Sequence, residues 1–212
     1  RKVQIIIDRM EYDQNPSPAL ISENFAKIKR IFAKQQETNK LIIDYYSILN
    51  RPVDKSNIDL KPFIQELIQL KNWDNEALIQ IEDLPKLQVD AVQVKRLFSN
   101  LIENCISFNR DQPDLRIEIC EIPFTSISNA SLPNLQNGFH VICIADNGIG
   151  VPQELHEKIF ELFQKTDDRT ELASKPGVGL SFSKRIMLNH DGWIEAHNNA
   201  PKGFKIYLFF PI

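Results

Sequence analysis

The stretch Ala145-Asp-Asn-Gly-Ile-Gly150 closes an apolar run and carries two closely spaced glycines. The apolar residues 140–145 before the turn are typical of a buried strand, and Asp-Asn-Gly is strong turn chemistry. Glycines leave room for the backbone to approach a flat ligand. A carboxylate at the end of a strand, here Asp146, can accept a hydrogen bond from an exocyclic amine. Taken alone, the stretch is more simply explained as an ordinary turn that ends a strand.

A helix predicted for residues 90–108 precedes this turn in the chain. Its apolar residues recur at helical spacing, and Asp90 is suited to cap its first turn. Asn100 and Asn104 lie one helical turn apart on a polar ridge beside the apolar face. An amide oxygen can bind a hard cation without adding charge. Asparagines on amphipathic helices are usually only solvated, so the pair alone predicts no site.

The segment Lys175-Pro-Gly-Val-Gly-Leu180 opens another predicted helix, over residues 180–189. Free N–H groups at the start of a helix bind phosphate, and glycines let the phosphate come close. The polar residues 164–175 before it include Lys165 and Arg169, and we interpret them as a lid that brings cations to a polyphosphate. For this segment alone, an ordinary loop before a helix is the simpler alternative.

The rest of residues 58–212 mixes helix and strand patterns. Helical spacing predicts helices over residues 60–70 and 152–163. The predicted strands cover residues 77–81, 87–89, 115–122, 140–145, 193–197 and 204–210, with a polar surface loop over 123–138. This order predicts an α+β fold, in which a two-layer α/β sandwich has its helices on one face of the sheet.

Residues 1–50 lack strand alternation and predict a helical hairpin. Asn15-Pro-Ser-Pro18 breaks the first helix, because proline lacks a backbone N–H and restricts the residue before it. The second helix, over residues 18–49, carries a heptad seam with two polar interruptions, formed by Phe25, Ile28, Phe32, Gln35, Asn39, Ile42, Tyr46 and Leu49. The first helix is too short to cover this seam, so we expect a homodimer that pairs two hairpins into a four-helix bundle. The alternative is a helical arm packed on its own domain.

The composition argues against several classes of protein. The chain has 212 residues, of which 42% are hydrophobic and 25% charged, as in ordinary globular proteins. A net charge of -3 argues against a nucleic-acid partner. No apolar run approaches the roughly 20 residues that a membrane segment needs. The three cysteines lie in apolar stretches, and their odd number predicts a reduced, intracellular setting, either the cytoplasm or another reducing compartment.

The order of these motifs along the chain is more specific than any one of them. In this combination, residues 58–212 resemble the ATP-binding domain of sensor histidine kinases, which has the Bergerat-type fold shared with DNA gyrase and a heat-shock chaperone. The matching stretches are Asn100-Leu-Ile-Glu-Asn104, Asp146-Asn-Gly-Ile-Gly150, Ile159-Phe-Glu-Leu-Phe163 and Gly177-Val-Gly-Leu180. Residues 1–50 resemble part of the family's dimerisation and phosphotransfer hairpin, and residues 51–57 are predicted to be a linker.

The resemblance implies that the ligands are ATP and Mg²⁺. Asp146 would hold the adenine amino group, and Asn104 would bind a Mg²⁺ ion that bridges the phosphates. The other implied nucleotide-binding residues are Asn100, Ser107, Phe108, Gly148, Gly150, Ile159, Lys165, Gly177, Val178, Gly179 and Leu180. The chain departs from the family pattern at Cys105, usually alanine, at Ser107, usually basic, and at Lys175, usually glycine.

The resemblance also implies a reaction. The gyrase branch uses a glutamate one turn before the metal-binding asparagine to activate water, but this chain has Asn100 there, and an amide is no general base. Glu103 points about 100° away from Asn104 around the helix, so we do not expect it to substitute. In the kinases, a histidine of the first hairpin helix attacks the γ-phosphate, and the phosphoryl group then passes to an aspartate of a response regulator.

Residues 1–50 contain no histidine. The four histidines of the chain are His140, His156, His190 and His197, and we interpret each as structural or solvated. We therefore expect the acceptor histidine a few residues upstream of Arg1. Two alternatives stay open: a non-catalytic nucleotide-binding scaffold of the same fold, and a gyrase-like ATPase.

Overall fold

The computed structural model describes residues 2–12, 17–109, 112–124, 138–164 and 177–212. The chain divides into two compact units, Arg1–Ser47 and Ile48–Ile212. The smaller unit consists of α1 (Lys2–Tyr12) and most of α2 (Pro18–Asn50). Proline is well tolerated at the first position of a helix, which explains why α2 begins directly at Pro18. Both helices of the predicted hairpin are therefore present.

The predicted seam of α2 is exposed along much of its length. Phe25 and Phe32 are 55% and 54% exposed, and Tyr46 is 60% exposed. Large apolar side chains at heptad spacing are normally covered by another helix. Their exposure leaves an apolar stripe on this unit.

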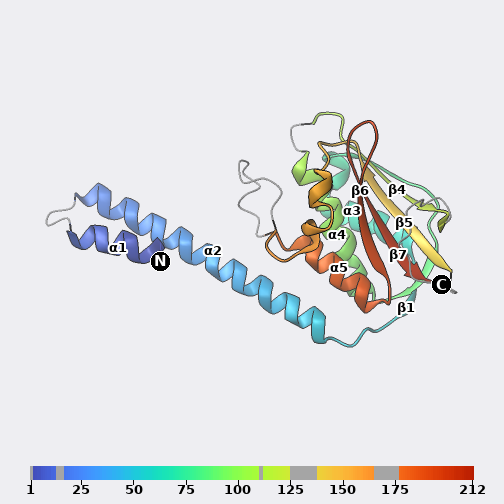
Figure 1. The fold of residues 1–212 in the computed structure, drawn as a ribbon, viewed down its shortest axis with the longest axis horizontal. Helices are drawn as coiled ribbons and strands as arrows, with labels where there is room; N and C mark the ends of the chain where they lie inside the picture. Colours follow the sequence, from blue (N-terminus) through green and yellow to red (C-terminus); the bar gives the residue numbers. More distant parts are fainter. Residues whose placement is uncertain (1, 13–16, 110–111, 125–137, 165–176) are drawn as a thin grey trace. The chain divides into compact units, whose positions relative to one another are not determined.

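The larger unit is built on a five-stranded sheet with the order β2-β4-β5-β7-β6. Its strands are β2 (Leu78–Ile81), β4 (Arg116–Ile122), β5 (Phe139–Asp146), β6 (Trp193–Asn198) and β7 (Phe204–Pro211). The β2–β4 pair is parallel, and the other pairs are antiparallel. Figure 1 shows that the helices α3 (Leu60–Lys71), α4 (Ala91–Phe108) and α5 (Gly179–Asn189) cover one face of this sheet. The predicted two-layer sandwich is confirmed.

The core forms where the apolar stripe of α4 meets one face of the sheet. Along β4, Ile117 and Ile119 are fully buried, whereas Glu118 between them is exposed. The side chains of α4 that are almost fully buried are Val94, Leu97, Phe98, Leu101 and Ile102. Burial of each such side chain stabilises the folded state by roughly 1.5–3 kcal/mol. The polar ridge of α4 therefore has a fixed orientation relative to the sheet.

Two predictions about the fold were wrong. Residues 51–57 are not only a linker, because β1 (Ser56–Asp59) pairs antiparallel with β3 (Lys86–Val89) in a separate two-stranded sheet. Only Ile58 is even half-buried in β1, so no apolar pattern marks the strand. Its partner strand supplies the order that the local sequence lacks.

The predicted helix over residues 152–163 is also absent. Two 3-10 turns, η3 (Gln153–Leu155) and η4 (Lys158–Phe160), take its place. The backbone leaves helical geometry at Glu161, where ψ is 152°, and Phe163 has a positive φ of 64°. The apolar spacing instead buries Ile159 and Phe160 from a single short turn. A third 3-10 turn, η1 (Trp73–Asn75), follows α3. The predicted loop 123–138 lies mostly outside the described residues.

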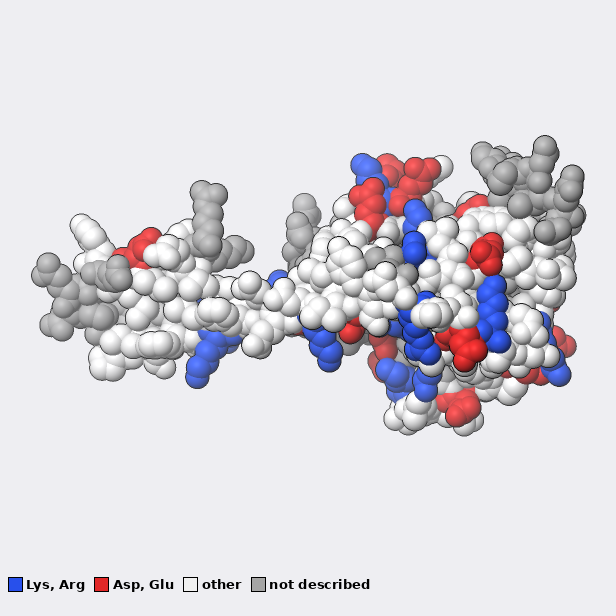
Figure 2. All heavy atoms as spheres, turned by 90° about the horizontal axis from the view of Figure 1, so that it is seen from below, with Lys and Arg blue, Asp and Glu red and all other residues white. Residues whose placement is uncertain are grey.

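The surface of the larger unit carries mixed charge. On the face drawn in Figure 2, acidic and basic side chains are interspersed, with no broad field of one sign among the described residues. Among these residues, no helix combines the length and apolarity that crossing a bilayer requires.

Asp90 joins the start of α4 to two other segments. Its carboxylate caps the helix by accepting hydrogen bonds from the N–H groups of Val92 (2.9 Å) and Gln93 (3.0 Å), and it also accepts one from Asp54 (3.2 Å). The Asp90 N–H in turn donates to Nε2 of His190, past the end of α5. Burial lowers the pKa of His190, which favours the neutral imidazole that this acceptor role requires.

We predict that Asp90→Ala lowers the free energy of unfolding by about 2 kcal/mol, because it removes a helix cap and leaves buried N–H donors unpaired. Asp59→Ala is the matched control, since Asp59 is the N-cap residue of α3 but makes no side-chain capping bond. We expect Asp59→Ala to cost less than about 0.5 kcal/mol. Urea denaturation measures both values, and equal losses would contradict the assignment.

Candidate functional site

Asp146 is the last residue of β5 and is only 5% exposed. Its Oδ1 accepts hydrogen bonds from the N–H groups of Gly148 (2.8 Å) and Phe204 (3.3 Å). The Cys105 thiol of α4 also favours the charged form of this carboxyl group and so lowers its pKa. Burial raises the pKa of Asp146, and the three donors oppose this rise because they favour the carboxylate. Neither backbone donor uses Oδ2, so this oxygen retains the capacity to accept a hydrogen bond from a ligand.

The side chain of Asn109, directly after α4, holds the turn that follows Asp146. It is buried, its Nδ2 donates to the Cys105 carbonyl (2.7 Å), and its Oδ1 accepts from the N–H of Ile149 (2.9 Å). A Cβ atom at Gly148 would lie 1.9 Å from this Oδ1. Position 148 therefore requires glycine as long as Asn109 keeps its place.

Two other segments brace the same turn. The side chain of Asn147 accepts a hydrogen bond from the Arg116 N–H of β4 (2.8 Å). From the β6–β7 connection, Asn199 donates to the Asp146 carbonyl (2.9 Å), and a Cβ at Gly203 would lie 1.9 Å from that carbonyl oxygen. The backbone around the buried carboxylate is thus fixed from both neighbouring sides.

The polar ridge of α4 connects this turn to the start of α5. Asn100 donates from its Nδ2 to the Gly179 carbonyl (3.2 Å). Asn104 follows one turn later, is half-buried, and has its Nδ2 3.8 Å from the position of a Cβ at Gly179. Cys105 and Asn109 then reach the turn after β5. One helix therefore carries polar contacts to both halves of the predicted site, with Asn104 between them.

The predicted phosphate-binding hinge precedes α5. Gly177 has a positive φ of 68°, and a Cβ there would lie 2.4 Å from the Gln164 carbonyl oxygen. The described residues on either side of 165–176 are therefore in contact. Val178 is the N-cap residue of α5 and provides no side-chain cap, so the helix start leaves N–H groups for an anion. The basic residues predicted for the lid, Lys165, Arg169 and Lys175, lie outside the described residues.

The other predicted nucleotide-binding residues differ in exposure. Ser107 and Ile159 are buried, Leu180 is half-buried, and Phe108 is 38% exposed. Gly150 has a positive φ of 74°, a conformation that favours glycine. Asn109, Asn199 and Gly203 were missed, because no pattern in the sequence pairs them with the turn that they hold.

Glu103 does not face the asparagine ridge. Its carboxylate forms an ion pair with Lys71 of α3, with the Nζ and Oε1 atoms 3.2 Å apart. The residue that could have replaced a general base is therefore engaged on another side of α4, as the helical spacing predicted.

Each of the four histidines has a hydrogen-bond partner within the larger unit. They pair as His140 with Glu121, His197 with Glu195, His156 with the Val151 carbonyl, and His190 with the Ile186 carbonyl and the Asp90 N–H. The contacts of His190, which is 2% exposed, hold it inside the core, whereas the His197 side chain is 42% exposed.

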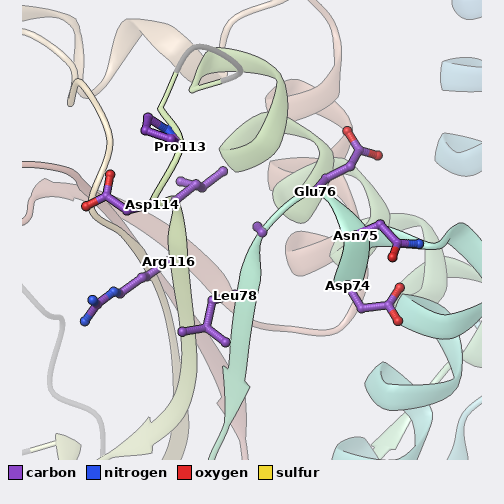
Figure 3. Close-up of a pocket in the computed structure, with 9 residues that line it drawn as sticks. Asp74, Asn75, Glu76, Leu78, Pro113, Asp114 and Arg116 are labelled. Atoms are coloured by element: carbon purple, nitrogen blue, oxygen red, sulfur yellow. The ribbon is translucent and has the colours of Figure 1, made fainter.

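A separate open hollow of about 400 Å³ lies where β2 and β4 begin. Figure 3 shows that its charged side chains do not converge: Asp114 and Arg116 point to one side, and Asp74 and Glu76 point to the other. This hollow therefore lacks the convergent polar groups of a ligand site.

The α/β sandwich thus combines a buried aspartate turn, an asparagine ridge and a glycine hinge around one helix, α4. The chain belongs to the family described as histidine kinase-, DNA gyrase B-, and HSP90-like ATPase, whose model matches residues 89–212. The match covers more than half of the chain and includes the ridge, the turn and the hinge.

Similar proteins include sensor kinases. The chain is 30% identical to the phytochrome-like protein Cph1 of Synechocystis over 161 residues, which are 76% of this chain and 18% of Cph1. It is 29% identical to the sensor protein kinase WalK of Staphylococcus aureus, over 75% of this chain and 25% of WalK. The chain thus spans a quarter or less of these relatives. The histidine kinase ThkA, solved in complex with the response regulator TrrA, shares its fold with a TM-score of 0.61 at 19% identity, over 99% of this chain and 56% of ThkA.

We predict that Gly148→Ala lowers the free energy of unfolding by about 2 kcal/mol, because the new methyl group displaces the Asn109 amide. In an Asn109→Ala background, the same change should cost much less. Urea denaturation of the two single variants and the double variant gives the coupling free energy. Gly138→Ala is the control, since a Cβ there meets only the flexible end of the Ile212 side chain. Strictly additive effects of Gly148→Ala and Asn109→Ala would contradict the proposed clamp.

Proposed function

We propose that residues 58–212 bind ATP with Mg²⁺ and act as the catalytic domain of a protein histidine kinase in a two-component signalling system. One observation carries the proposal: helix α4 bears Asn104 and contacts both the turn after Asp146 and the Gly177–Leu180 hinge. Membership in a family of histidine kinase-like ATPases supports it. Residues 51–55 then connect the hairpin 1–50 to this domain, whose first strand, β1, begins at Ser56.

Asp146 is the proposed contact to adenine. Its Oδ1 already accepts two backbone hydrogen bonds, so Oδ2 is suited to accept one from the exocyclic amino group. Gly148 and Gly150 would keep side chains away from the base. Ile159, buried in η4, is the proposed apolar contact to the base.

The phosphates are assigned to the other end of the α4 ridge. The uncapped start of α5, with Gly177, Val178, Gly179 and Leu180, presents N–H groups to them. Asn104 would hold Mg²⁺ through its amide oxygen, together with phosphate oxygens, because this ion keeps most of its water and needs few protein ligands. Lys165 is the proposed cation on the lid side.

Phosphoryl transfer then requires a nucleophile that residues 1–50 do not contain, since they have no histidine. The acceptor is proposed to be a histidine upstream of Arg1, which passes the phosphoryl group to an aspartate of a response regulator. The solved complex of ThkA with its response regulator supports this type of partner. A homodimer formed by the hairpin is supported by the exposed apolar seam of α2, including Phe25 and Phe32.

Hydrolysis by a gyrase-like route is disfavoured by Asn100. Its amide donates to the Gly179 carbonyl and cannot take a proton from water. ATP is therefore expected to persist until the histidine arrives. The second candidate, a scaffold that binds the nucleotide without transfer, is favoured by Ser107 and Lys175, where the family pattern has a basic residue and a glycine.

We predict that Asp146→Ala weakens ATP binding by about 30-fold or more, because a hydrogen bond to a charged acceptor is lost. Isothermal titration calorimetry measures the affinity, with Asp83→Ala as the control. Asp83 is fully exposed and pairs only with Lys61 among the described residues. Unchanged affinity in the Asp146 variant would exclude the assigned pocket.

A ligand-side comparison covers the case in which Asp146→Ala is unstable. ITP carries a carbonyl in place of the amino group, so the unaltered protein should bind it at least about 30-fold more weakly than ATP. Asp146→Asn should reduce this discrimination.

Because burial raises the pKa of Asp146, ATP affinity should fall as the pH drops through that raised value, and the Asp146→Asn variant should lack this fall.

We predict that a chain extended to include the upstream residues becomes labelled by γ-phosphate-labelled ATP. The label should be lost in acid and stable in alkali, as expected for phosphohistidine, and replacement of the upstream histidine should abolish it. Tight ATP binding without label would favour the scaffold. Steady ATP turnover that collapses in Asn100→Ala would favour the gyrase-like ATPase.

A further inference from the structure

Two cysteines face each other on the sheet, away from the proposed nucleotide site. The antiparallel register of β4 and β5 pairs Cys120 directly with Cys143. Cys143 is 6% exposed and Cys120 is half-buried, so the directly opposed pair is accessible from the Cys120 side. Side chains alternate along a strand, so Cys143 and Asp146 point to opposite faces of the sheet. The pair is therefore independent of the adenine contact.

The geometry of the pair suits a disulfide. Directly opposed residues of antiparallel strands have Cα atoms about 4.5–5.5 Å apart. Disulfides span Cα separations of about 4.4–6.8 Å. The bond can therefore form by side-chain rotation, without a shift in strand register.

The surroundings divide the two thiols into a nucleophile and a proton donor. The hydrogen bond from the Cys143 thiol lowers the pKa of Cys120, and the charge of Lys205 acts in the same direction, while burial and the charges of Glu82 and Glu118 oppose it. The same hydrogen bond, together with burial, raises the pKa of Cys143. Cys120 is thus the more readily ionised thiol, and it is also the more exposed one.

We propose that Cys120 and Cys143 form an oxidation site at which hydrogen peroxide produces an intrachain disulfide between β4 and β5. The Cys120 thiolate attacks one peroxide oxygen, the O–O bond breaks, and the leaving hydroxide takes a proton to become water. The sulfur of Cys143 then attacks the resulting sulfenic acid, the S–O bond breaks, and water leaves with the Cys143 proton. Two thiols and one peroxide yield one disulfide and two waters, with the sulfurs oxidised and the peroxide oxygens reduced.

The sequence makes peptide mapping of this bond direct. No Lys or Arg lies between residues 117 and 157, so trypsin leaves both cysteines in one peptide, whereas Cys105 lies in the separate peptide 97–110. We expect peroxide treatment of the whole chain to lower the mass of the first peptide by about 2 Da. Chymotryptic cleavage after Phe124 or Phe139 should then give two fragments joined only by the disulfide.

Matched variants test the order of the steps. Cys143→Ala should leave Cys120 as a sulfenic acid that dimedone traps, Cys120→Ala should abolish the reaction, and Cys105→Ala should leave the disulfide unchanged. A trivalent phenylarsenical needs two adjacent thiols, so one molecule should bind per chain. It should not bind Cys120→Ala or Cys143→Ala. This experiment tests the proximity of the two thiols independently of oxidation. The proposal would be overturned if peroxide left Cys120 and Cys143 as two thiols. It would also be overturned if the disulfides formed involved Cys105 or linked two chains.

Discussion

The hydrogen bonds that converge on the buried carboxylate of Asp146 are the constraint on which the rest of the site depends. A carboxylate removed from water is costly unless it is paired with donors. Here the donors come from three directions: the turn itself through Gly148, the start of β7 through Phe204, and α4 through the Cys105 thiol. Sheet and helix layers must therefore both be in place before this group is accommodated. Each donor also fixes the backbone beside the acceptor, so we expect the turn to tolerate little variation.

Helix α4 sets the distance between the two halves of the site. Asn100 contacts the start of α5, and Asn109 contacts the turn after β5. These residues are nine positions apart, which corresponds to roughly 13 Å along a helix axis. The buried apolar face of α4 locks this ridge against the sheet, so the separation is set by packing and not by loops. In the proposed function, this separation divides a base-binding end from a phosphate-binding end, and Asn104 lies between them.

The sequence was sufficient for the elements whose signal is local and periodic. The amphipathic spacing of α4, the apolar run of β5 and the glycines before α5 each identified an element, and their order identified the family. What it could not provide are contacts between distant segments. Nothing local pairs Asn109 with Gly148, or Gly203 with the Asp146 carbonyl, because these interactions exist only after the layers assemble. The same reason accounts for β1, a polar strand ordered by β3, and for η3 and η4, where apolar spacing suggested one helix. The lid cation Lys165 lies outside the described residues and stays a prediction.

Asn100 stands where the gyrase branch has a glutamate, and this difference has a structural as well as a chemical consequence. As an amide, this residue can donate to the Gly179 carbonyl, a contact that a carboxylate at the same position would repel. The helix α5 is thereby tied to α4 at the point where the proposed phosphates lie. The amide of Asn100, which cannot act as a general base, therefore also holds the hinge in position through this hydrogen bond. Glu103, the acid on this helix, is engaged with Lys71 of α3 away from the asparagine ridge. In the proposed function, a site built in this way holds the nucleotide in place, and the transfer depends on a nucleophile from outside residues 58–212.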